Sequence, residues 1–162
     1  MAVAAYPVKM VKKHNGSAAW FTEDTVEASG TQAYTAGNLV LVAASGAVTE
    51  ATSAAVAGIL GIAQTTATGT TSTAAIVEVV EPGDIIEMSL VNGSTTLVTG
   101  ALSDLYKKYG LYVSGHETYL DQGASATPMA QIVGIVKDKN GAYTSRVWCT
   151  PIATTLVVGT GL

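Results

Sequence analysis

Short apolar runs alternate with turn residues along most of the chain, and this pattern is typical of β-strands rather than helices. The segment 37–51, GNLVLVAASGAVTEA, predicts a hairpin with one strand at 39–42 and a second around Val48. Ser45–Gly46 supplies the turn between them. We therefore expect antiparallel pairing in this part of the chain.

Two further segments carry strand and turn signals. Residues 130–152 predict a hairpin with Asn140–Gly141 at its tip, because both residues tolerate positive φ. Residues 74–91 predict a strand pair with a turn at Pro82–Gly83–Asp84, and the small polar residues 65–74 before it predict a loop. The whole pattern predicts a mainly β fold.

Two of the expected strands share a central glycine, Gly61 in ILGIA and Gly134 in IVGIV. Gly37 and Gly110 precede them at the same distance in sequence. A glycine inside a strand usually marks a bulge, a bend or a close approach of two backbones. The spacing predicts a barrel or sandwich of two related halves that bends at these two positions.

One short helix is expected at 103–110, SDLYKKYG. Ser103 can cap its first turn, and Lys107 and Lys108 suit the negative end of the helix dipole. Gly110 can end it. We thus predict a small β-sandwich or barrel with one short helix, formed as a single body by residues 17–162 after an extended N-terminal arm, residues 1–16.

Charged residues make up only 12% of the chain, against about 25% in an ordinary soluble domain. A surface covered by Thr, Ser, Ala and Gly can pack against other proteins, which indicates assembly, and a small Thr-rich monomeric β domain fits the same composition equally well. Lys9, Lys12 and Lys13 precede the first acid, Glu23, whereas the rest is acidic and the net charge is -4. We expect no nucleic-acid partner.

The order of lysines and apolar residues at the N-terminus does not fit a secretory signal, and no run reaches the roughly 18 apolar residues that span a membrane. We expect no membrane partner and synthesis in the cytoplasm. The single cysteine, Cys149 beside Trp148, excludes an intramolecular disulfide and is expected to be buried.

Residues suited to catalysis are sparse. His14 and His116 lie in no metal-binding or catalytic spacing, and His116 is expected to be solvated in a turn. The acids of EPGD, residues 81–84, could bind a cation but are expected to be turn and edge-strand charges. We predict no enzyme activity, no catalytic or metal site and no cofactor.

The order of these motifs resembles the small capsid decoration (cement) proteins of tailed bacteriophages, which have a β-rich body and an N-terminal arm. The resemblance rests on residues 36–63, on EPGDIIEM at 81–88, and on 105–121 leading to QIVGIV at 131–136. It covers roughly residues 36–150. Its motifs are patterns of turns and small residues rather than catalytic signatures.

The resemblance implies a protein of the virion, on the outer capsid surface. Such proteins bind as trimers or other small oligomers and bridge neighbouring subunits of the major capsid protein, which strengthens the shell. Several modest contacts made by one oligomer would gain avidity.

We expect the arm, residues 1–13, to add a strand to a capsid subunit, the alternative being a frayed tail. Its lysines would face capsid carboxylates. The C-terminal segment 152–162 is expected to pair as a strand with the body or with a neighbouring protomer. The arm residues expected to bind the capsid are Val3, Val8, Lys9, Met10, Val11, Lys12 and Lys13.

Two other classes remain open on the sequence. A carbohydrate-binding or adhesin-like module would use a cluster of exposed aromatic side chains, which Tyr106, Tyr109, Tyr112 and Tyr119 could form. These tyrosines equally suit core packing. Another head or tail component of the virion is the third possibility.

Overall fold

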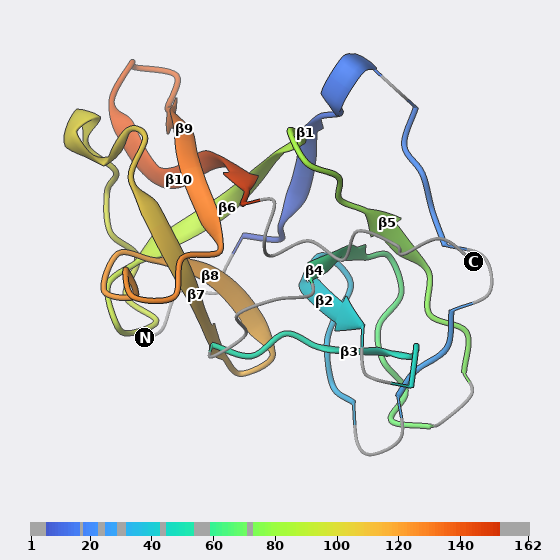
Figure 1. Ribbon diagram of the computed structural model, residues 1–162. Helices are drawn as coiled ribbons and strands as arrows, with labels where there is room; N and C mark the ends of the chain where they lie inside the picture. Colours follow the sequence, from blue (N-terminus) through green and yellow to red (C-terminus); the bar gives the residue numbers. More distant parts are fainter. Residues whose placement is uncertain are drawn as a thin grey trace.

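The computed structural model shows a mainly β protein with two sheets (Figure 1). The structure describes residues 6–16, 18–22, 25–28, 32–42, 45–53, 59–70 and 73–152. Helical structure in these residues is confined to the 3-10 turns η1 (His14–Gly16) and η2 (Leu102–Asp104). The expected fold class is confirmed.

The larger sheet has six strands in the order β1-β6-β10-β9-β7-β8. Leu90 of β6 also pairs with Leu120 of β8 in parallel, so five of these strands close into a small barrel. The other four neighbouring pairs of the barrel are antiparallel. The strands are β1 (Lys9–Lys12), β6 (Ile85–Val91), β7 (Lys108–Ser114), β8 (Glu117–Asp121), β9 (Ala130–Lys137) and β10 (Tyr143–Pro151).

The smaller sheet has four antiparallel strands in the order β3-β2-β4-β5. A neighbouring segment closes it, because Phe21 bridges to Glu78 in antiparallel fashion and Glu27 bridges to Val48 in parallel. The strands are β2 (Leu39–Val42), β3 (Val48–Glu50), β4 (Ile59–Ala63) and β5 (Val77–Val79).

The two sheets repeat one strand order. β2, β3, β4 and β5 pair with one another as β7, β8, β9 and β10 do, and the parallel closure onto β3 matches the parallel closure onto β8. The expectation of two related halves is confirmed. We call the residues of the four-stranded sheet and its closing segment the first half, and the barrel that contains β6 to β10 the second half (Figure 1).

Gly61 and Gly134 each lie beside a one-residue irregularity of strand pairing, on equivalent strands but toward non-equivalent neighbours. Val40 pairs with Gly61 and Leu41 with Ile59, so Leu60 between them lacks a partner in the β2–β4 ladder. In β9 the ladder steps from Gly134 to Ile132 in the same way. A Cβ on Gly61 would collide with the carbonyl oxygen of Glu78. A bulge is thus confirmed at both glycines, and a close approach of two backbones is confirmed at Gly61.

Each half has its own core. The larger cluster fills the second half and extends to Leu39, Leu41 and Ile62, which project from the first half against it. The smaller cluster fills the first half with Tyr34, Val40, Val48, Ala63, Ala75 and Val77. The halves are therefore packed on each other by one face of β2 and β4.

Three local expectations need correction. The helix expected at 103–110 is only the turn η2, since the Asp104 carboxylate accepts from Ala101 N at 2.8 Å and from the Tyr109 hydroxyl at 3.1 Å, and β7 begins at Lys108. In the hairpin of β9 and β10, Gly141 has a φ of +84° and Asn140 does not take a positive φ.

The third correction concerns residues 74–91. β5 and β6 are joined by the turn at Pro82–Gly83, as expected, but they lie in different sheets and do not pair with each other. At the other end of the chain, Ile152 N donates to Met129 O at 2.9 Å. The rest of the expected C-terminal strand, 153–162, lies outside the described residues.

Candidate functional site

The described part of the N-terminal arm lies on this chain's own body. β1 pairs antiparallel with β6, which offers an open edge next to the point where β8 closes the barrel. Val8 is 2% exposed and Met10 packs against the larger core cluster. Val3 lies outside the described residues. The strand addition expected of the arm, residues 1–13, toward a capsid subunit is made by residues 9–12 to the chain's own β6.

Lys13 anchors the end of β1 to the connection between the halves. Its ammonium lies 2.7 Å from Asp84 Oδ2 and 3.3 Å from Glu81 Oε2, and it donates to Val79 O at 2.9 Å. Asp84 also accepts from His14 N and Glu81 N. Burial acts to lower the pKa of Lys13, but the hydrogen bonds and charges of Asp84 and Glu81 outweigh it and leave that pKa raised.

This anchor corrects two expectations. Lys13 is buried and paired within the chain, so it does not face a partner's carboxylate. The acids of EPGD do hold a cation, but that cation is the chain's own ammonium group. No local sequence signal singles out this pair, because Lys13 directly follows Lys12 and its partner Asp84 is far away in sequence.

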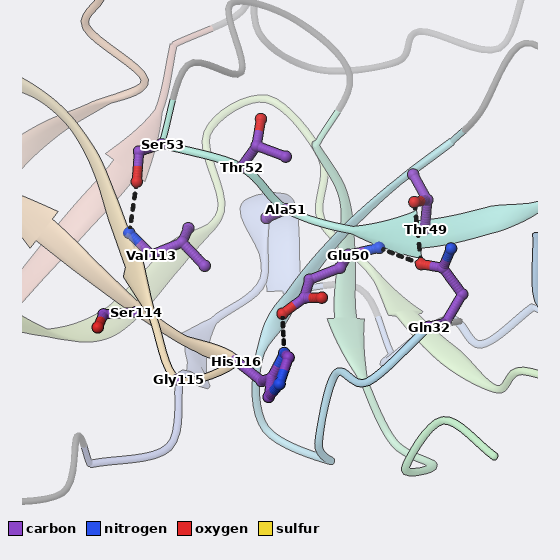
Figure 2. A pocket seen from close by; sticks show the side chains of 10 residues that line it. All are labelled: Gln32, Thr49, Glu50, Ala51, Thr52, Ser53, Val113, Ser114, Gly115 and His116. Carbon is purple, nitrogen blue, oxygen red and sulfur yellow. Dashed lines mark hydrogen bonds and ion pairs between the residues drawn. The ribbon is translucent and has the colours of Figure 1, made fainter. Parts of the chain in front are cut away.

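A cleft of about 550 Å³ lies where the two halves meet (Figure 2). His116, in the turn between β7 and β8, places Nδ1 2.8 Å from Glu50 Oε1 on β3. Val113 N donates to Ser53 Oγ at 2.7 Å, and Gln32 Oε1 accepts from Glu50 N at 3.0 Å. The expectation that His116 is solvated in a turn is confirmed, since 53% of its side chain is exposed. Sequence reasoning missed its contact with Glu50, which it did not single out.

The cleft is lined by polar contacts that connect the two halves. Glu50 and Ser53 belong to the first half, whereas Val113 and His116 belong to the second, so both contacts tie the halves together. His116 holds a φ of +68°, a left-handed conformation that is rare outside glycine. The open cleft offers hydroxyl, amide and carboxylate groups that could contact a polar ligand.

The four tyrosines around the β7 segment do not form one exposed cluster. Tyr106 is exposed, whereas Tyr109 and Tyr119 are buried. Tyr112 is half-buried and its ring centroid lies 6.3 Å from that of Tyr119. Cys149 is buried as expected, and burial raises the pKa of its thiol to about 12, which makes it a poor nucleophile.

Large apolar side chains are exposed on both halves. On the second half, Trp148 of β10 lies beside Glu87 of β6, and we name the Trp148 patch after it. On the first half, the Phe21 patch lies along the segment that pairs with residues 74–79. The Trp148 patch is Tyr6, Lys9, Glu87, Arg146 and Trp148, and the Phe21 patch is Trp20, Phe21, Val26 and Ile76.

Within the described residues, no group of three or more His, Cys, Asp or Glu side chains could hold a metal ion. None of the helical segments in the same part of the chain has the length and apolar character to cross a membrane. Comparison with protein-family models, with curated proteins and with solved structures finds no match for this chain.

Proposed function

We propose that this chain is a capsid decoration protein that binds the outer surface of a phage head as a small homo-oligomer. It stabilises the shell by bridging major capsid protein subunits and catalyses no reaction. The observation that carries the proposal is the pair of exposed aromatic patches on a chain with only 12% charged residues. Exposed apolar patches on a β surface are typical of protein–protein contact sites.

The fold supports this proposal in a second way. Two related halves, each with an exposed aromatic patch, give one chain two separate contact regions. A protein that bridges neighbouring subunits needs at least two such regions, and joining them in one chain raises the effective concentration of the second contact.

The test is binding to heads. Purified protein is mixed with expanded heads that lack it, from the phage that encodes the chain, and the heads are sedimented and melted. We expect saturable co-sedimentation and a raised melting temperature of the heads. Heads that neither bind the protein nor gain stability would contradict the proposal.

A polar ligand-binding module, for example one that binds carbohydrate, is the second candidate. It is favoured by the cleft of about 550 Å³ between the halves, whose lining includes Gln32, Glu50 and His116. A glycan array separates the two candidates. Binding that is lost on Glu50→Ala, with heads left unbound, would favour this second function.

A further inference from the structure

The Trp148 patch is built around one buried carboxylate. Glu87 is only 6% exposed although it lies on the outer face of β6, between the inward-facing Ile86 and Met88. Its oxygens accept from Arg146 Nη1 at 2.8 Å and from Trp148 Nε1 at 3.1 Å, and Lys9 Nζ lies 3.3 Å away. Three side chains from two strands, β1 and β10, are thus held by one carboxylate on β6.

Two more contacts fix the exposed rings. Gly134 lies opposite Trp148 in β9, and a Cβ there would come within 2.9 Å of the indole, so the glycine leaves the space that the ring occupies. The Arg146 guanidinium lies 5.4 Å from the centre of the Tyr6 ring, and Tyr6 N donates to Ser89 Oγ at 3.1 Å. Trp148 nevertheless remains 40% exposed.

This arrangement is that of a prepared contact surface. Trp, Tyr and Arg are the residues that most often dominate binding energy at protein interfaces. Side chains already fixed in the free protein lose little conformational entropy when a partner covers them. The bonds to Glu87 therefore lower the entropic cost of binding through the ring of Trp148.

The charge of the patch selects the partner. Lys9 and Arg146 provide two cations against the single carboxylate of Glu87, and the side chain of Lys9 is 58% exposed. An incoming carboxylate would find an unbalanced positive charge beside an apolar ring. A nucleic acid fits less well, because two cations on a chain of net charge -4 give little attraction for a phosphate backbone.

We propose that the Trp148 patch is the docking surface for a protein partner that presents a carboxylate beside apolar side chains. The partner's identity rests on the proposed function, in which it is the outer surface of the major capsid protein. The apolar side chains cover the Trp148 indole, and the carboxylate lies against Lys9 and Arg146.

The experiment measures the affinity of variants for the expanded heads described above, at low and at high salt. Trp148→Ala is expected to weaken binding by about 30-fold or more. Arg146→Ala is expected to weaken it by about tenfold at low salt and less at high salt. Leu102→Ala is the matched control, since Leu102 in η2 is 63% exposed on the same half and belongs to neither patch, and it should change affinity by less than about threefold.

The outcomes separate the two proposals. Heads that do not bind wild-type protein contradict the proposed function, whereas heads that bind Trp148→Ala as well as wild type overturn only the docking surface. Trp148→Phe keeps an aromatic ring at this position and serves as a second variant in case Trp148→Ala does not fold. Circular dichroism verifies that each variant is folded. A loss of binding in Leu102→Ala as large as that in Trp148→Ala, or binding of a single-stranded oligonucleotide that depends on Trp148, would also overturn the inference.

Discussion

The two halves of this protein share a strand order and differ in what fills them. Leu90, Met88 and Ile132 are among the large side chains that fill the second half, whereas the core cluster of the first half includes Ala63 and Ala75. The first half also turns Leu39 and Ile62 outward, into the core of its neighbour. Strand order is thus preserved while apolar volume is not, and we expect the first half to depend on the second for stability.

The largest expected effect is at the connection between the halves. Asp84→Ala removes the acceptor of a buried ammonium and of two backbone N–H groups, so we expect a loss of about 3–5 kcal/mol in the free energy of unfolding. Lys13→Met should lose less, because Asp84 then keeps its two backbone donors. Urea unfolding monitored by circular dichroism measures both. Equal losses would mean that the ion pair itself dominates.

The next comparison sets the two cores against each other. Leu90→Ala in the second half should reduce the free energy of unfolding by about 3–4 kcal/mol and loosen both halves. Val48→Ala in the first half should cost about 2 kcal/mol and leave the amides of β9 and β10 protected. Hydrogen exchange distinguishes these outcomes. Loss of protection in both halves from Val48→Ala would show that the dependence is mutual.

The two bulge glycines should respond unequally. Gly61→Ala drives a Cβ into the backbone of Glu78, which cannot move without breaking the β4–β5 ladder, and we expect a loss of about 3 kcal/mol. Gly134→Ala meets only the Trp148 side chain, which can shift at the cost of its hydrogen bond to Glu87, and should cost about 1 kcal/mol. Thermal unfolding of the two variants in parallel is the measurement. The reverse ranking would contradict the assignment of backbone contact to Gly61.

The smallest effects are expected at two buried tyrosines. The Tyr34 hydroxyl is buried in the first half and has no hydrogen-bond partner among the described residues, so Tyr34→Phe should be neutral or stabilise by up to about 1 kcal/mol. The Tyr109 hydroxyl in the second half donates to Asp104, and Tyr109→Phe should cost about 1–2 kcal/mol. Denaturant midpoints measure the difference. A destabilised Tyr34→Phe would indicate a partner for that hydroxyl, such as a bound water.

Local signals in the sequence predicted local structure well. The turns at Gly46 and Gly83 take positive φ, as the hairpin and turn patterns require, and the bulges at Gly61 and Gly134 follow from glycine's missing side chain. Periodicity alone also indicated the two-half organisation. Each of these features depends on residues that are close in sequence or on a repeated pattern.

Features that join distant residues could not be predicted. Lys13 finds Asp84, and Glu50 finds His116, only after the strands between them have paired. The expected helix failed for a related reason, since the Tyr109 hydroxyl bonds to Asp104 and Tyr106 N donates to Ile132 O, which commits the following residues to β7. Tertiary contacts there override the local helix signals.

The placement of the chain's two tryptophans has a practical consequence. Trp20 lies in the first half and Trp148 in the second, and both rings are partly open to water. Replacing either one leaves a single tryptophan, and its fluorescence, excited where the seven tyrosines hardly absorb, reports on one half. Tryptophan fluorescence can then show, without an attached label, in which order the halves melt. It can also show which half a bound particle shields from a quencher.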